Sequence, residues 1–134
     1  MLAQAMSING AKVYITGRRE ETIKKSAELH SPKIGKGSII PIVGDVSTKE
    51  GVMKLVDEFK KHESVLHTLC NNAGIAKDKE TTLFSTNESL DFKSAESVSE
   101  HLLRSNFDNW SETFTTNVSA IYFTSAAFLP LLAK

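Results

Sequence analysis

Four consecutive residues, Asn71, Asn72, Ala73 and Gly74, follow directly after a short apolar run. Amide side chains both donate and accept hydrogen bonds, whereas alanine and glycine leave the main chain open to close approach by a bound group. Two interpretations fit these residues equally well. They form either a plain tight turn or a place where a large ligand lies against the backbone.

Two other apolar runs also end in small or polar residues. The first is followed by Gly17 and Arg18, and the second ends in Asp45 and Val46. Open parallel sheets bind ligands outside the carboxyl ends of their strands, where such residues would meet. The three ends together therefore predict one ligand site.

The elements that must position these residues alternate between strand and helix. The pattern predicts strands at 11–16, 38–46 and 65–70, helices at 19–30, 47–62 and 107–133, and a short helix at 96–104. Ser47 and Glu50 predict a capping box at the start of the second helix. Near-continuous apolar strands are typical of a parallel sheet covered on both faces. The sequence therefore predicts an α/β fold with a doubly wound parallel sheet.

Composition narrows the function. The 134 residues carry 16 basic and 16 acidic side chains, so no broad field attracts nucleic acid or an anionic membrane. No apolar run has the length of a membrane span, and residues 1–10 lack the pattern of a secretory signal. Cys70 is the single cysteine, and we expect it to be a small buried hydrophobe. We therefore predict a cytoplasmic protein that binds neither nucleic acid nor a membrane.

Four segments in this order resemble the short-chain dehydrogenase/reductase family. "NNAG" is similar to the family's signature after an apolar strand, and "GAKVYITGRRE", "IVGDVS" and "WSETFTTNVSAIYFTSAAFLPLL" resemble its second strand, third strand and fourth helix. The resemblance covers about 1–74 and 107–134, and longer details are similar to 3-oxoacyl-carrier-protein reductases. It implies a partial Rossmann-like sheet that binds NAD or NADP.

The resemblance also implies roles for single residues. The implied cofactor-binding residues are Arg18, Asp45, Val46, Asn72, Ala73 and Gly74. NAD-binding members place an acidic residue at the end of the second strand, where this chain has Gly17 followed by Arg18. A guanidinium can grip a 2′-phosphate, so NADP is the predicted cofactor. Asp45 is placed by the adenine in the family, but it also fits a plain loop before a helix.

Asn117 is the implied catalytic residue. It lies between Phe114 and Ile121 on an apolar helical stripe that we expect to be buried, so its amide needs hydrogen-bond partners. The residues alone indicate a satisfied polar group in the core. The resemblance implies that Asn117 helps to hold a water in a proton relay to the catalytic lysine.

Other parts of the family pattern are not found. The family's catalytic tyrosine is followed four residues later by lysine, but Tyr14 and Tyr122 are followed by Arg18 and Ala126. Residues 1–10 resemble the end of the family's first helix, so its first strand and glycine-rich turn are missing. That strand lies between the second and fourth strands in such sheets. We therefore predict a gap beside 65–70, and a chain that is poorly stable alone or re-pairs its strands.

The prediction is thus a fragment of an NADP-preferring oxidoreductase that transfers hydride between a nicotinamide and a carbonyl or alcohol. Residues 75–106 are predicted to be an insertion within this partial domain. The helix at 107–133 is the family's usual interface between subunits. The alternative is a non-catalytic nucleotide-binding remnant or a protein that inserts into a related subunit.

Overall fold

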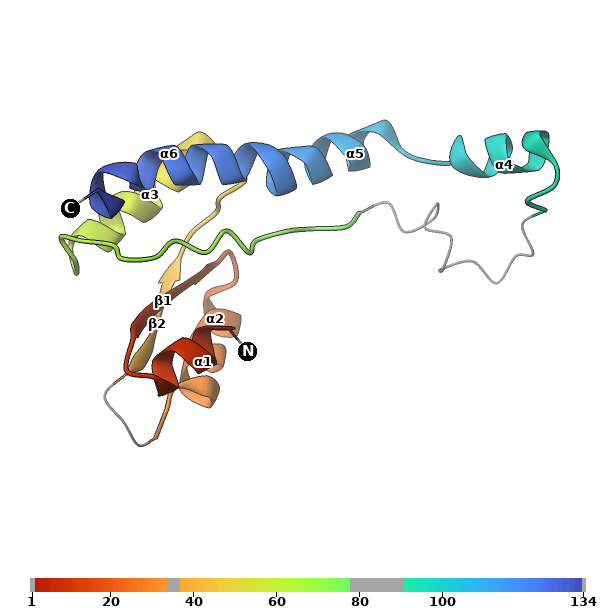
Figure 1. Cartoon of the computed structure of the whole chain (residues 1–134). Helices are drawn as coiled ribbons and strands as arrows, with labels where there is room; N and C mark the ends of the chain where they lie inside the picture. The colour runs from red at the N-terminus through yellow and green to blue at the C-terminus, as the bar shows by residue number, and fades with distance from the viewer. Residues whose placement is uncertain (1, 34–36, 78–90, 134) are drawn as a thin grey trace.

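The computed structural model describes residues 2–33, 37–77 and 91–133. Its elements are α1 (Leu2–Ile8), β1 (Lys12–Gly17), α2 (Glu20–His30), β2 (Ser38–Val43), α3 (Lys49–Lys60), α4 (Ala95–Leu102), α5 (Phe107–Phe114), the π-helical turn η1 (Thr115–Ser119) and α6 (Ala120–Leu132). Figure 1 shows that β1, β2, α1 and α2 form one part of the molecule and that α3 joins it to the long α5–η1–α6 rod. The predicted α/β class is confirmed.

The two strands form a parallel pair. The register runs without interruption from Lys12 opposite Ser38 to Gly17 opposite Val43. Pro41 is accommodated because β2 lies at an edge, where a missing amide donor leaves no ladder bond unmade. Ile23 and Ala27, four residues apart on one face of α2, are buried.

A single apolar core joins the sheet to the helices. It contains the buried residues Ile42, Leu55, Val56, Phe59, Phe128 and Leu131. Phe59 meets Tyr14 of β1 and Phe128 of α6 edge to face, with ring centroids 5.0 and 5.6 Å apart. Such pairs add specific geometry to area burial, so Phe59 is the centre of the core.

Helix α3 begins differently from the prediction. Its first residue is Lys49, and the Thr48 hydroxyl, not that of Ser47, accepts a hydrogen bond from the amide of Gly51 at 3.0 Å. The Ser47 hydroxyl instead donates to the carboxylate of Asp45 at 2.7 Å. The predicted capping box is therefore wrong, because a stronger charged acceptor lies two residues earlier.

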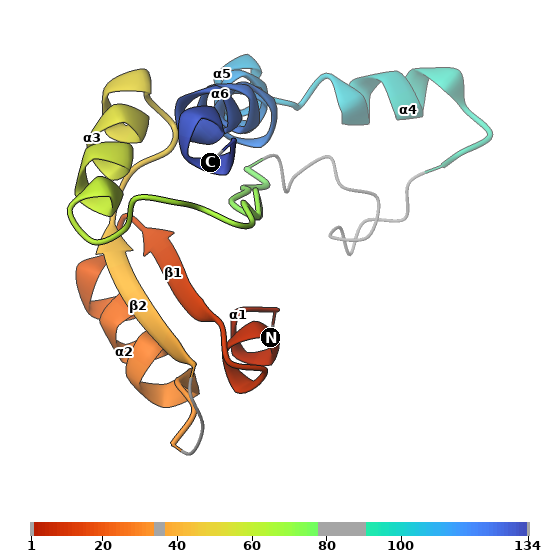
Figure 2. The ribbon, with the colours of Figure 1, turned by 60° about the vertical axis from the view of Figure 1, so that its left-hand side comes forward.

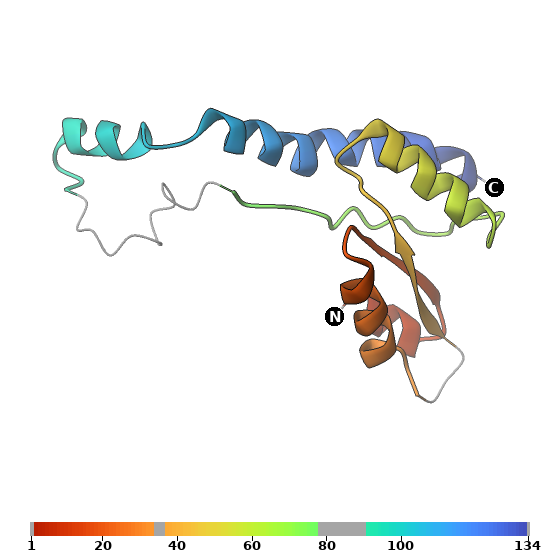
Figure 3. The same cartoon turned by 180° about the vertical axis from the view of Figure 1, so that it is seen from behind.

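The predicted helix at 107–133 is one continuous rod with a π-helical turn in its middle (Figure 3). The expectation of a buried stripe on it is wrong for most of its length. Trp110, Phe114 and Ile121 are exposed by 49%, 55% and 41%, whereas Phe128 and Leu131, near the end of α6, lie in the core. The reason is that α3, which also packs on β2, meets the rod at α6, whereas α5 and η1 extend beyond it.

The predicted strand at 65–70 is also wrong as a strand. These residues run without a ladder partner among the residues that the structure describes. Figure 2 shows β1 and this segment on two sides of an open space, and a cavity of about 1040 Å³ lies between them. The predicted gap is therefore confirmed. Cys70 is exposed rather than buried, because it lies along this open edge.

Candidate cofactor site

The gap brings most of the predicted cofactor-binding residues together. Val46, Asn72, Ala73 and Gly74 line the same cavity, together with Thr16 near the end of β1. Asn72 and Gly74 are exposed, so a bound group could reach their main chain. Arg18 and Asp45 are not among the lining residues, but they follow the ends of β1 and β2. A backbone bond of 3.2 Å from Gly44 to Gly17 keeps these two ends side by side.

Asp45 is held in one orientation by Ser47. The amide and hydroxyl of Ser47 both donate to Asp45 Oδ1, at 2.9 and 2.7 Å. These bonds hold the pKa of the Asp45 carboxyl below its ordinary value, the hydroxyl bond more than the amide bond, and the charge of Arg18 lowers that pKa further. The arrangement presents a fixed carboxylate, which can accept a hydrogen bond from an amino group.

Arg18 is exposed at the point where β1 turns into α2. Gly17 brings no carboxylate to this point, and Glu20, in the first turn of α2, pairs with Lys24 at 2.6 Å. Arg19 is also exposed and makes no side-chain cap bond to α2. The end of β1 therefore offers a guanidinium to solvent with a fixed carboxylate nearby.

Asn117 lies in the π-helical turn and clamps the chain after Gly74. Its Nδ2 donates to the carbonyl of Ile75 and its Oδ1 accepts from the amide of Ile75, both at 2.8 Å. A Cβ at Gly74 would lie 3.3 Å from Asn117 Oδ1, so a small residue suits this position. The expectation that the amide needs partners is met, although the neighbouring stripe is exposed.

Further bonds fix the segment 66–77 along the rod. The Leu66 amide donates to the Leu131 carbonyl at 3.0 Å, and Asn71 Nδ2 donates to Ser125 Oγ at 3.0 Å. Lys77 forms an ion pair with Glu112. As the residue numbers along the segment increase, the residue numbers of their partners on the rod decrease. The segment therefore runs antiparallel to the rod. Asn71 thus bonds to helix α6.

Sequence reasoning missed two contributors to this region. Ser47 orients Asp45, and the Asp-Val-Ser spacing, which favours a local side-chain turn, could have indicated it. Glu63 accepts from Lys12 Nζ at 2.5 Å and from the Tyr14 hydroxyl at 2.8 Å, across the cavity mouth. The Lys12–Glu63 pair is separated by 51 residues, so only the fold brings it together.

The described ranges 2–33, 37–77 and 91–133 hold no group of three or more metal-binding side chains. In the same ranges, every helix is too short or too polar to cross a membrane. The polar groups at the cavity end are a guanidinium, a carboxylate, amides and open main chain. This donor set suits a nucleotide, because it offers both charge and backbone contacts.

All 134 residues match the short chain dehydrogenase family. The chain belongs to this family. It is 34% identical to the short-chain dehydrogenase/reductase PhomF of Diaporthe leptostromiformis, across 98% of this chain and 42% of that protein. It is 30% identical to the 3-oxoacyl-[acyl-carrier-protein] reductase FabG of Chlamydia muridarum, across 99% of this chain and 45% of that protein. The chain thus spans less than half the length of these curated relatives.

Solved structures confirm the partial Rossmann-like fold. The Pseudomonas aeruginosa RhlG/NADP active-site complex aligns with a TM-score of 0.73 at 24% identity, over 97% of this chain and 41% of that one. The oxidoreductase yciK from E. coli aligns with a TM-score of 0.71 at 21% identity, over 97% of this chain and 46% of that one. At such identities the likeness establishes the fold alone.

Proposed function

We propose that this chain is the cofactor-binding part of an NADP-preferring oxidoreductase. The whole enzyme would transfer hydride between the nicotinamide and a carbonyl or alcohol substrate. One observation carries the cofactor preference. The exposed Arg18 follows Gly17 at the end of β1, where NAD-binding members have an acidic residue, and the charge of Arg18 acts on the fixed Asp45 carboxylate. Family membership supports the reaction class.

Each predicted residue has a distinct task in this proposal. Arg18 binds the 2′-phosphate through charge-assisted hydrogen bonds, and Asp45 accepts from the adenine amino group. Val46 is partly buried against the core, so it offers an apolar wall to the adenine. Asn72, Ala73 and Gly74 let the ribose and phosphates lie against the main chain. The bound nicotinamide supplies or accepts the hydride.

Asn117 is a positioning residue in this proposal. Both ends of its amide bind the main chain of Ile75, so it fixes the segment that carries Ala73 and Gly74. Its position also suits the family's role of holding a water in a proton relay. The serine, tyrosine and lysine that complete this relay are proposed to lie outside residues 1–134.

The cofactor proposal is tested by binding of NADPH and NADH to the native polypeptide that carries these residues. Replacing Arg18 by Ala should weaken NADPH binding by about tenfold or more and leave NADH unchanged, because a charge-assisted hydrogen bond is worth roughly 1.5–3 kcal/mol. Arg19→Ala is the matched control, since its exposed guanidinium is one residue away. Equal weakening of both cofactors, or none of either, would contradict the preference.

The fragment proposal is tested by the intact mass of the protein from its source. A mass near twice the 14.7 kDa of this chain supports an oxidoreductase with its remaining residues present. A mass equal to 14.7 kDa favours the non-catalytic alternative. The predicted cytoplasmic location stays a prediction.

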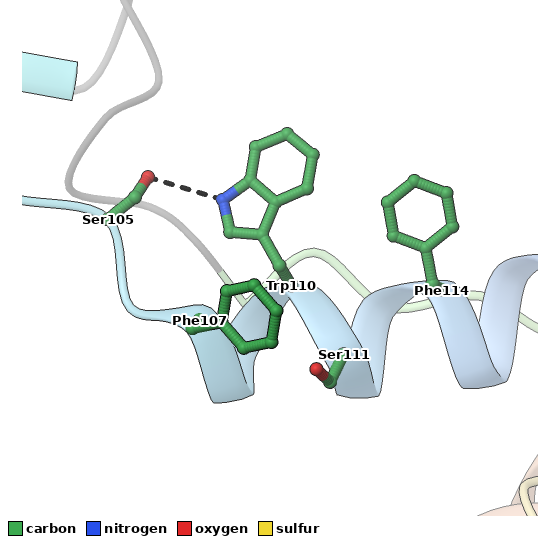
Figure 4. A pocket seen from close by; sticks show the side chains of 5 residues that line it. All are labelled: Ser105, Phe107, Trp110, Ser111 and Phe114. Carbon is green, nitrogen blue, oxygen red and sulfur yellow. Dashed lines mark hydrogen bonds between the residues drawn. The ribbon is translucent and has the colours of Figure 1, made fainter. Parts of the chain in front are cut away.

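We also propose that the rod α5–η1–α6 pairs with a second copy of the chain. Figure 4 shows Phe107, Trp110 and Phe114 projecting from α5 beside Ser105 and Ser111, and these five residues line a hollow of about 570 Å³. Trp110 and Phe114 stack with centroids 6.0 Å apart. Exposed aromatic groups of this kind are typical of protein interfaces. Sedimentation of the native protein should show a dimer or tetramer, and Trp110→Lys should shift it toward the monomer.

A further inference from the structure

Gly51, in the first turn of α3, lies where a side chain has no room. A Cβ at this position would lie 2.0 Å from the carbonyl oxygen of Asp45 and 2.9 Å from Thr48 Oγ1. Real Cβ atoms essentially never come within 3.0 Å of another atom, so any other residue would force the two backbones apart by about 1 Å. A helix alone favours alanine over glycine, so the contact with Asp45 is the feature that requires glycine here.

Helix α3 is the less movable partner in this contact. Its side chains Val52 and Val56 are each 1% exposed, and Phe59 is 3% exposed. A helix held by such close packing cannot shift without disturbing the core. Asp45, by contrast, is only half-buried in the turn after β2. A side chain in place of Gly51 should therefore displace the turn and leave the helix where it is.

The turn that would move carries the Asp45 carboxylate as one unit. The amide and hydroxyl of Ser47 bind Asp45 Oδ1 at 2.9 and 2.7 Å, so the orientation of the carboxylate is set within the turn. Its position relative to the rest of the site is set by how closely the turn approaches α3. Arg18 follows the other strand, β1, so a displacement of the turn does not carry it along. The displacement should thus change the adenine end of the proposed site and spare the phosphate end.

We infer that Gly51 is a positioning residue that makes the proposed nucleotide site selective for adenine. This inference rests on the proposed function, in which the Asp45 carboxylate accepts a hydrogen bond from the adenine amino group. Such a bond joins heavy atoms about 2.7–3.2 Å apart, so a displacement of about 1 Å breaks it. The close approach that Gly51 allows therefore keeps the carboxylate where the amino group can reach it.

The test compares NADPH with its hypoxanthine analogue, in which a carbonyl oxygen replaces the adenine amino group, on the native polypeptide that carries these residues. The native protein should bind NADPH about tenfold more tightly than the analogue, because a carbonyl cannot donate to Asp45. Gly51→Ala should weaken NADPH binding about tenfold and leave binding of the analogue unchanged, so that the two affinities become similar. The preference for NADPH over NADH should not change, because Arg18 stays in place.

Two further variants separate positioning from a general loss of structure. Thr48→Ala removes the cap of the same helical turn but adds no atom beside Asp45, so it should leave the ratio of the two affinities unchanged. Asp45→Ala should abolish the preference for adenine by itself, and adding Gly51→Ala to it should have no further effect on the ratio. Both affinities are measured on one preparation, so a partial loss of folded protein cancels from their ratio.

The possible results distinguish this inference from the proposed function. If the native protein prefers NADPH to the analogue and Gly51→Ala keeps that preference, the inference is overturned while the proposed function stands. Equal binding of NADPH and the analogue by the native protein would show that Asp45 does not read the amino group, which also overturns the inference. If the native protein binds neither, the proposed function fails and the inference fails with it. A Gly51→Ala variant that does not fold would mean that α3 moves instead of the turn, contrary to the inference.

Discussion

Two extended parts of this chain differ in whether their backbones pair with a neighbouring strand. Residues 12–17 and 38–43 form a parallel ladder in continuous register, whereas residues 65–75 form none with the residues that the structure describes. Both parts have apolar sequences of strand type. The second is held by Leu131, Ser125 and Asn117 of the long rod, through one backbone bond and three side-chain bonds.

The comparison shows that strand type in sequence is a property of the side chains, whereas a strand in structure needs a neighbour. A peptide group gains its ladder bonds from an adjacent strand, and these cannot be replaced by burial alone. The rod supplies enough specific bonds to place 65–75 without a ladder. That placement keeps Asn72–Gly74 on the cavity that they were predicted to share with Val46.

The largest effect should come from breaking the core that joins the two parts. Phe59→Ala should lower the free energy of unfolding by about 3–5 kcal/mol, because the ring is 3% exposed and contacts both Tyr14 and Phe128. Urea unfolding measures this. Leu29→Ala is the control, since that side chain on α2 is 70% exposed and should change the value by no more than about 0.5 kcal/mol. Equal losses would mean that Phe59 does not join the two parts.

Removing the Asn117 clamp should loosen the segment without a ladder and spare the sheet. Asn117→Ala leaves the amide and carbonyl of Ile75 without their partner, at a cost of about 1–3 kcal/mol. Amide exchange at Ile75 should become faster, whereas exchange in β1 and β2 should not change. Asn71→Ala removes one exposed bond and should cost less. A faster rate in β1 as well would show that the two parts are not held separately.

A smaller effect should follow from the cap of α3. Thr48→Ala should cost about 1 kcal/mol and speed exchange in the first turn of α3, because the Gly51 amide loses its acceptor. Ser47→Ala should leave that turn protected. If Ser47→Ala were the variant that frays the helix, the cap would be Ser47 after all.

The smallest effect should be on the stability of the protein at acid pH, through the pKa of Asp45. The folded-state pKa of Asp45 lies below its ordinary value of 3.8, so the stability that it contributes is complete above that value and is lost as the pH falls through the folded pKa. Ser47→Ala removes the largest cause of the shift and should raise the pKa of Asp45. Titration of the carboxyl by NMR in both chains measures this. An unchanged pKa would show that Ser47 does not orient Asp45.

Most of the fold followed from the sequence because its signals are local. The helix predicted at 47–62 is found as α3, and the four apolar residues at helical spacing on it are all buried: Val52, Leu55, Val56 and Phe59. The β-formers of 11–16 and 38–46 predicted two strands, although β2 ends at Val43. The gap beside 65–70 followed from the resemblance to the family, not from any local signal.

The wrong predictions concern residues whose burial or hydrogen bonding depends on a neighbouring part of the fold. Phe114 and Ile121 have the spacing of a buried stripe, but the part of the rod that α3 buries is the face of α6 with Phe128 and Leu131, so the stripe stays exposed. Cys70 is apolar and lies in an apolar run, but its edge has no neighbour. Ser47 and Thr48 are both good caps, and the choice between them was made by the carboxylate of Asp45.

The sequence predicted which residues gather at the candidate site better than it predicted the hydrogen bonds that hold them. Val46, Asn72, Ala73 and Gly74 do share a cavity, and Arg18 and Asp45 lie at the neighbouring strand ends. The bonds of Asn117 to Ile75 and of Asn71 to Ser125 span 42 and 54 residues, so no local pattern could indicate them. The predicted insertion at 75–106 stays a prediction, and residues 78–90 of it lie outside the described residues.

Amide exchange along the whole chain tests the central claim most directly. The account predicts strong protection where β1 and β2 face each other, protection at Leu66 and Ile75 through their bonds to the rod, and fast exchange at 67–74 between them. Continuous protection from 66 to 72 in the chain alone would contradict it. That result would mean that the segment has found a strand to pair with, and that the gap has closed.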